Sequence, residues 1–123
     1  MLGFQKRKKV LLLEDDPAMQ RLVSTLLKRE GYRVDVVGSG REAIRLVGEE
    51  DYDALLLDLM MPVEGGMTVI AHLREQKPEV LRRVAVITGS PSSVLDAISR
   101  EVAIVPKPFD AATLIAAVRR LSS

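Results

Sequence analysis

Four acidic residues of this sequence follow or end short apolar runs. Glu14, Asp15 and Asp16 follow one run, and Asp58 ends another. In an open parallel sheet the carboxyl ends of the strands meet at one edge, where binding sites form. Carboxylates gathered there repel one another unless a cation lies between them. Because these side chains offer only oxygen ligands, the sequence predicts a magnesium site rather than a zinc site.

Two further polar side chains belong to later apolar runs. Thr88 ends one run, and Lys107 follows another, between two prolines. Taken singly, such residues usually serve as turn residues, helix caps or solvated cations. Together, carboxylates, a metal ion, a hydroxyl and an ammonium are the groups that transfer a phosphoryl group to an aspartate. We therefore expect Asp58 to attack in line, while Mg²⁺ and Lys107 offset charge on the phosphoryl oxygens.

Apolar runs and helical patterns alternate five times along the chain. The runs predict strands at residues 10–13, 33–37, 54–58, 84–88 and 103–105. The stretches between and after them carry apolar side chains three and four residues apart, which is typical of helices. This alternation predicts an α/β fold, with a doubly wound, parallel, five-stranded sheet and right-handed crossovers.

Capping residues indicate where the helices begin and end. Asp16 and Pro17 open the first helix, and Gly31 closes it. A capping box that starts at Ser39 opens the second helix, and Gly48 is predicted to end it. The other helices are predicted to begin at about Gly66, at Ser90-Pro91 and at Asp110. The inward face of the first helix is predicted to comprise Met19, Leu22, Val23, Leu26 and Leu27.

Size and composition limit the class of protein. The 123 residues are enough for one domain, with 47% hydrophobic and only 3% aromatic residues. We expect a single domain over residues 1–123, with a core at about 9–121 and a basic leader at 1–8. The absence of cysteine excludes disulfides and thiolate metal sites, and no apolar stretch is long enough to span a bilayer. These absences lead us to expect a cytoplasmic protein without membrane contact. A net charge of +1 predicts no direct binding of nucleic acid.

Four segments together resemble the motifs of response-regulator receiver domains, the CheY-like superfamily of two-component signal transduction. They are Leu11-Leu12-Leu13-Glu14-Asp15-Asp16-Pro17, Leu56-Leu57-Asp58-Leu59-Met60-Met61-Pro62, Val86-Ile87-Thr88-Gly89 and Lys107-Pro108-Phe109. The resemblance covers the chain from about Lys9 to Leu121. It implies the flavodoxin-like strand order 2-1-3-4-5. One such motif is weak evidence, but four in order on the predicted strand ends are strong.

The resemblance also implies a role for each site residue. Asp15 resembles a direct Mg²⁺ ligand, and Glu14 resembles a residue that acts on the ion through water. Asp58 resembles the phospho-acceptor and a second ligand, with the backbone carbonyl of Met60 as the third. Thr88 resembles the switch hydroxyl that moves to the phosphoryl group. Lys107 resembles the phosphate-pairing lysine, which a cis Lys107-Pro108 bond would aim.

The function implied by the resemblance is that of a phosphorelay switch. The domain would accept a phosphoryl group from a histidine kinase or a histidine phosphotransfer protein and signal by a conformational change. It would catalyse only its own phosphorylation and dephosphorylation, and so would not be an enzyme. A homodimer through the face formed by the fourth helix, fifth strand and fifth helix is also implied.

Three positions depart from the family pattern. Ile104 stands where an aromatic residue usually couples to the switch threonine, and a β-branched side chain cannot make the same rotamer change. The stretch from Thr88 to Lys107 is a few residues shorter than is common, so we expect a trimmed fourth helix or exit loop. Pro106 replaces a residue with a backbone donor, which an edge strand tolerates.

Two other classes of protein remain as alternatives. A hydrolase of the haloacid-dehalogenase type also uses aspartate, Mg²⁺, threonine and lysine. Its nucleophile belongs to an Asp-x-Asp pattern after the first strand, and the segment at Glu14 lacks the first aspartate. The second alternative is a receiver fold that serves only as a binding module, which the isoleucine at position 104 favours.

Overall fold

Five parallel strands form one sheet, as the alternating pattern predicts. The computed structural model describes residues 7–61, 64–89 and 92–123. The strands are β1 (Lys9–Leu13), β2 (Arg33–Val37), β3 (Ala54–Asp58), β4 (Val84–Thr88) and β5 (Ala103–Pro106). They lie in the order β2-β1-β3-β4-β5 and all pair in parallel, so the predicted fold class and strand order are confirmed.

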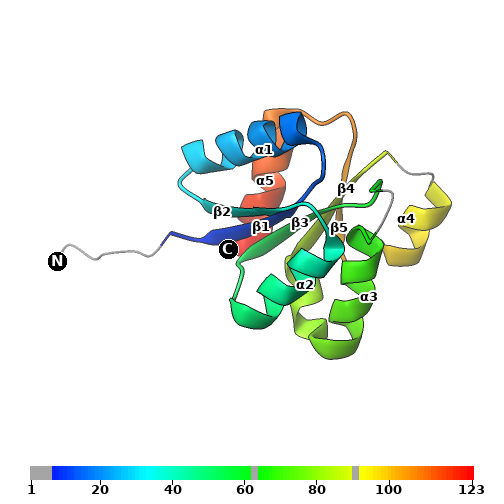
Figure 1. Ribbon diagram of the computed structural model, residues 1–123. Coiled ribbons are helices and arrows are strands. Elements are labelled where there is room, and N and C mark those ends of the chain that lie inside the picture. The colour runs from blue at the N-terminus through cyan, green and yellow to red at the C-terminus, as the bar shows by residue number, and fades with distance from the viewer. Residues whose placement is uncertain (1–6, 62–63, 90–91) are drawn as a thin grey trace.

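Helices cover both faces of this sheet (Figure 1). They are α1 (Pro17–Arg29), α2 (Gly40–Glu49), α3 (Gly66–Gln76), the 3₁₀ helix η1 (Pro78–Arg83), α4 (Ser92–Ile98) and α5 (Ala111–Ser122). Helices α1 and α5 lie on one face, and α2, α3 and α4 lie on the other. With 7 residues, α4 is the shortest α-helix of the described chain.

Alternation along the strands divides the core into two layers. In β3, Leu55 and Leu57 pack with α2 and α3, whereas Ala54 and Leu56 pack with α1 and α5. Successive side chains of a strand point to opposite faces, so a strand covered on both sides must be apolar at every position. All five residues of β3 are buried, and the last of them is Asp58.

Most helix ends follow the predicted caps. The side chain of Asp16 accepts the Met19 N–H, that of Ser39 accepts the Glu42 N–H, and that of Asp110 accepts the Thr113 N–H. Gly31 follows α1 with φ +92°, a left-handed conformation that glycine adopts without strain. The predicted cap at Ser90-Pro91 lies outside the described residues, as do residues 1–6 of the predicted leader.

Two of the sequence-based predictions about helices are wrong. Gly48 does not end α2, because the helix continues to Glu49 and the N–H of Glu50 still donates to Leu46. Leu22 does not join the core, because 49% of it is exposed on the outer side of α1. A helical pattern identifies an apolar face, but it does not show how far the neighbouring elements cover that face.

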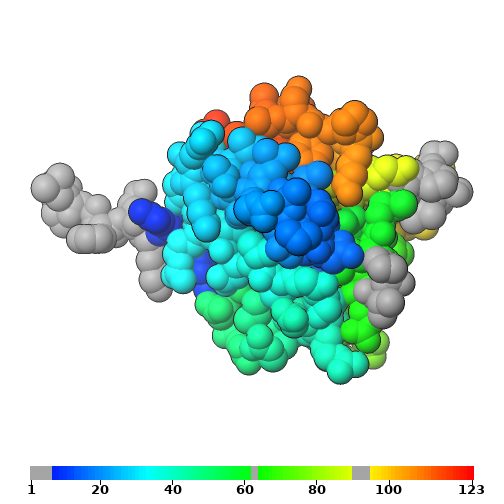
Figure 2. All heavy atoms as spheres, turned by 45° about the horizontal axis from the view of Figure 1, so that its top comes forward, coloured from blue at the N-terminus to red at the C-terminus, as the bar shows by residue number. Residues whose placement is uncertain are grey.

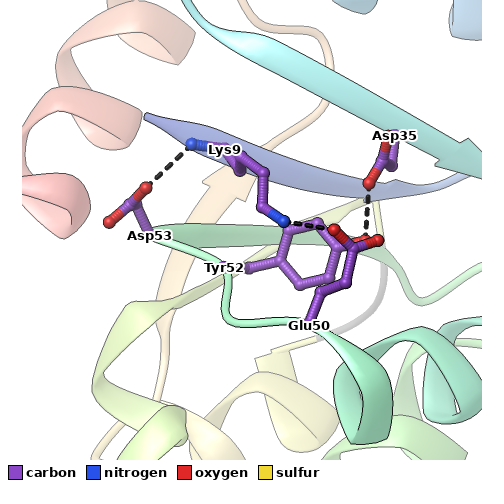
Figure 3. A network of polar contacts seen from close by, with 5 residues as sticks. All are labelled: Lys9, Asp35, Glu50, Tyr52 and Asp53. Carbon is purple, nitrogen blue, oxygen red and sulfur yellow. Dashed lines mark hydrogen bonds and ion pairs between the residues drawn. The ribbon is translucent and has the colours of Figure 1, made fainter. Parts of the chain in front are cut away.

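A polar network fastens the amino-terminal end of the sheet, opposite the predicted site (Figure 3). The hydroxyl of buried Tyr52 donates to Asp35 on β2 at 2.7 Å. The ammonium of Lys9 on β1 lies 5.2 Å from the centre of the Tyr52 ring and pairs with Glu50. The backbone of Lys9 also exchanges two hydrogen bonds with Asp53. Burial and the nearby Asp35 raise the pKa of Tyr52, so the phenol stays neutral and continues to donate.

We predict that Tyr52→Phe lowers the free energy of unfolding by about 1 kcal/mol, because it removes a hydrogen bond to a charged acceptor. Tyr32→Phe is the matched variant, since it removes a hydrogen bond to the neutral hydroxyl of Ser122, and it should cost less. Urea unfolding followed by circular dichroism measures both. An unchanged midpoint for Tyr52→Phe, or a larger loss for Tyr32→Phe, would contradict this account of the network.

Candidate functional site

The predicted site residues meet at the carboxyl edge of the sheet. Parallel pairing aligns Leu13 with Leu57, so Glu14 comes level with Asp58 at the edge of the sheet. Pairing also aligns Thr88 with Pro106, the residue before Lys107. The Lys107 N–H donates to the carbonyl of Thr88 at 2.9 Å, which extends the pairing of β5 as far as the lysine. The Lys107-Pro108 peptide bond is cis, as expected.

Three carboxylates form the centre of this site. One carboxylate oxygen from each of Glu14, Asp15 and Asp58 lies within 4.8 Å of the others. Glu14 is 2% exposed and Asp58 is 4% exposed, whereas Asp15 faces solvent. Burial of two carboxylates close together is unfavourable, because each loses water and repels the other. Asp16 stands apart from this cluster as the cap of α1.

Burial raises the pKa of Glu14 to about 7, and the charge of Asp58 adds to this rise. A hydrogen bond from the Asp16 N–H to Glu14 at 3.1 Å and the positive charge of Lys107 oppose it. The ammonium of Lys107 lies 3.7 Å from Oδ1 of Asp58. The charge of Lys107 thus acts on Asp58 and Glu14, and the three carboxylates together leave the site with an excess of negative charge.

The donor set of this cluster fits a magnesium ion. Carboxylate oxygens are hard ligands, and Mg²⁺ is usually bound in proteins through one or two of them. The backbone after β3 also turns back toward Asp58, since the Met60 N–H donates to Oδ1 of Asp58 at 2.8 Å. Glu14, Asp15 and Asp58 are thus the residues that could hold the ion, with the Met60 backbone close beside them.

Thr88 and Ile104 lie on the adjacent strands β4 and β5. Thr88 ends β4 and is 1% exposed. Ile104 lies on β5 opposite Val86 and packs partly buried against the core layer of α2 and α3. An aliphatic side chain that packs against the core therefore occupies the position where the family pattern has an aromatic one.

Sequence reasoning missed three residues that shape the site. The Gln20 side chain on α1 donates to the backbone carbonyl of Glu14 at 2.6 Å and fixes the turn after β1. The Gly40 N–H donates to the carbonyl of Glu64, in the loop after Asp58. Glu64 has φ +42°, a conformation that residues other than glycine rarely adopt. The sequence offered one signal for these residues, the glycine at position 40 within the capping box. That glycine did not indicate that its partner is the carbonyl of Glu64.

The comparisons with known proteins agree with this geometry. The family model described as "Response regulator receiver domain" matches residues 10–119. The chain therefore belongs to the response regulator receiver domains of two-component systems. Among the described residues, no helix is both long and apolar enough to cross a membrane.

Curated relatives are longer than this chain. The transcriptional regulatory protein TcrA of Mycobacterium tuberculosis is 37% identical over 93% of this chain and 46% of its own length. The DNA-binding response regulator MtrA of Mycolicibacterium smegmatis is 33% identical over 92% of this chain and 50% of its own length. The chain thus spans about half the length of these relatives.

Solved structures have the same fold. The receiver domain of a sensor histidine kinase from Pseudomonas aeruginosa superposes with a TM-score of 0.82 at 27% identity, over 96% of this chain and 100% of that one. That structure has a magnesium ion coordinated in its active-site cleft. The chemotaxis response regulator CheY4 of Vibrio cholerae gives a TM-score of 0.80 at 25% identity, over 94% of this chain and 99% of that one.

We predict that Glu14→Gln stabilises the metal-free protein at pH 8 by about 1–3 kcal/mol, because it removes a charge that burial disfavours. The folded state holds its proton on Glu14 up to about pH 7, whereas the unfolded state loses it near 4.5. The stability contribution of this group is therefore present below pH 4.5 and is lost as the pH rises to 7.

The measurement is urea unfolding in EDTA at pH 5 and pH 8. The advantage of Glu14→Gln should be small at pH 5 and larger at pH 8, and saturating Mg²⁺ should reduce or reverse it. A variant that is less stable than the wild type at pH 8 without metal would contradict the assigned charge excess.

Proposed function

We propose that this receiver domain accepts a phosphoryl group on Asp58 from a partner histidine kinase or histidine phosphotransfer protein. The observation that supports this most strongly is the setting of Asp58. It is a buried carboxylate at the end of a fully buried strand, with two more carboxylates within 4.8 Å and the Lys107 ammonium at 3.7 Å. A carboxylate that serves only as a turn residue or cap gains nothing from such a setting.

In the proposed reaction a carboxylate oxygen of Asp58 forms a bond to phosphorus. The bond between phosphorus and the donor breaks, and its electron pair leaves with the donor. The product is an acyl phosphate on Asp58, and hydrolysis later returns the carboxylate and inorganic phosphate. Glu14, Asp15, Asp58 and the carbonyl of Met60 would hold Mg²⁺. When bound, the ion would offset negative charge on the phosphoryl oxygens.

Lys107 and Thr88 have separate roles in this proposal. The Lys107 ammonium, already 3.7 Å from Oδ1 of Asp58, offsets the charge of the incoming phosphoryl oxygens. Pairing of the Lys107 backbone with Thr88 holds the lysine over the site. The Thr88 hydroxyl would turn toward the phosphoryl group. Ile104 on β5 cannot follow it with the rotamer change of an aromatic residue, so the usual readout through β5 would be altered in this domain.

The domain acts on itself alone in this proposal, in the cytoplasm, and turns over no free substrate. The homodimer through the face of α4, β5 and α5 stays a prediction. The longer relatives TcrA and MtrA carry names of transcriptional and DNA-binding regulators. An output of that kind would belong to a chain that extends beyond a receiver domain.

We predict that the wild-type protein, incubated with acetyl phosphate and Mg²⁺, gains the mass of one phosphoryl group. The gain should be lost in EDTA and in Asp58→Asn, which keeps the size of the side chain but lacks the nucleophilic carboxylate. Intact-protein mass spectrometry measures the product directly.

Three results would change the assignment. Unchanged phosphorylation of Asp58→Asn would show that another residue is the acceptor. No adduct on the folded wild type would favour the interpretation as a binding module. Steady hydrolysis of a phosphate ester by the wild type would instead revive the hydrolase interpretation, which the family comparison does not support.

We predict that Lys107→Ala slows phosphorylation about 100-fold, as the loss of a charge aimed at developing negative charge usually does. The same change should tighten Mg²⁺ binding, because it removes a positive charge that lies close to the carboxylates. Rates by mass spectrometry and affinities by calorimetry measure the two effects. Weaker Mg²⁺ binding together with a normal rate would contradict the role assigned to Lys107.

A further inference from the structure

The turn between β2 and α2, residues 37–40, forms backbone hydrogen bonds with two segments near the carboxylate cluster, at Glu14 and at Glu64. At its start the carbonyl of Val37 accepts the N–H of Glu14 at 3.0 Å. At its end the N–H of Gly40 donates to the carbonyl of Glu64. One short turn thus connects the end of β1 with the loop that follows Asp58, and Figure 1 shows the first turn of α2 beside the start of α3.

Gly40 makes this contact possible because it has no side chain. As the first residue of α2 it has an N–H that no carbonyl within the helix accepts. A Cβ at this position would lie 2.3 Å from the carbonyl oxygen of Glu64 and 2.9 Å from its carbonyl carbon. Both are backbone atoms, so they could move away only if the loop moved with them.

The conformation of Glu64 is held from outside the loop. Its φ of +42° is unfavourable for a residue with a Cβ and persists only where the surroundings enforce it. Two contacts with the first turn of α2 do so, namely the Gly40 hydrogen bond and an ion pair between Arg41 and Glu64 at 3.6 Å. The ion pair is exposed and weak, so the backbone contact at Gly40 is the stronger constraint.

A shift of Glu64 would reach the acceptor itself. Two residues further on, a Cβ at Gly66 would lie 2.9 Å from the carbonyl oxygen of Asp58 and 2.8 Å from the side chain of Leu59. Glu64 therefore packs against the first turn of α2, and Gly66 packs against the end of β3. The Met60 N–H, bonded to Asp58, belongs to the same loop.

We propose that Gly40 is a positioning residue for the phosphorylation site. Its close backbone contact holds the loop after Asp58 where the Asp58 carboxylate and the Met60 carbonyl can bind the metal together. The inference rests on the function proposed above for the same site. It adds that α2, which contributes no carboxylate to the cluster, determines the affinity for Mg²⁺.

The test compares Gly40→Ala with Gly48→Ala in the same helix. A Cβ at Gly48 meets nothing within 4 Å, so that change adds a methyl group without a clash. Gly40→Ala should weaken Mg²⁺ binding about tenfold, as changes behind metal ligands do. It should also slow phosphorylation by acetyl phosphate about tenfold or more at limiting Mg²⁺, because the acceptor is misplaced. Gly48→Ala should match the wild type in both. Calorimetry and intact mass, well below the melting temperature of each variant, give the two values.

A second measurement keeps the proposal testable if Gly40→Ala does not fold. In the wild type the Gly40 amide should exchange slowly with deuterium, and more slowly still when Mg²⁺ is added. A folded Gly40→Ala variant with normal Mg²⁺ affinity and rate would overturn the inference, as would a Gly40 amide that exchanges at the rate of an open chain. Both results leave the phosphorylation of Asp58 intact, whereas a wild type that gains no phosphoryl group overturns the proposed function instead.

Discussion

Repulsion among three carboxylates at one edge of the sheet is the constraint on which the rest of the structure depends. Glu14 and Asp58 are almost fully buried, and their oxygens lie within 4.8 Å of each other and of Asp15. Lys107 supplies one positive charge at 3.7 Å from Asp58, which is too little to balance the three carboxylates. In the metal-free protein burial raises the pKa of Glu14, and the charge of Asp58 adds to this rise. A divalent cation would offset this charge, so the same repulsion that destabilises the metal-free protein favours the binding of a cation.

The fold imposes this arrangement because the register of the buried strands fixes where the acidic residues at their carboxyl ends lie. β3 pairs with β1 and β4 in fixed register, and its first four residues are leucines and an alanine with no exposure. A slip of one residue would turn these side chains to the wrong face, so the register is strongly specified.

Asp58 is buried because it ends this buried strand. The Met60 N–H then holds the Asp58 carboxylate, and the Gln20 side chain on α1 holds the backbone of Glu14. The surface of α1 also leaves Leu22 exposed beside Lys107 and Phe109, which border an open groove together with Met19. In Figure 2 this helix, in blue to cyan, lies alongside the orange segment that follows β5.

The sequence was sufficient for the sheet and for the residues at its edge, because both follow from local pattern. Five apolar runs predicted the strands, and the strand ends alone placed Glu14, Asp15, Asp58, Thr88 and Lys107 at one edge. The errors came where neighbours decide the outcome. Gly48 is typical of a helix end, but α2 continues past it to Glu49. Leu22 belongs to the apolar pattern of α1, but no neighbouring element covers its side chain fully. The contact between Gly40 and Glu64 joins segments far apart in the chain, so no pattern within either segment could reveal it.

The central claim is that the carboxylate cluster is a magnesium site, and thermal unfolding at fixed ionic strength tests it most directly. A ligand that binds only the folded state raises the melting temperature with its concentration. Millimolar MgCl₂ should therefore raise the melting temperature of the wild type above that in NaCl of equal ionic strength, and Asp15→Asn should reduce the difference. Equal melting temperatures in the two salts would mean that the buried carboxylates tolerate one another without a metal ion, and the assignment of a magnesium site would be wrong.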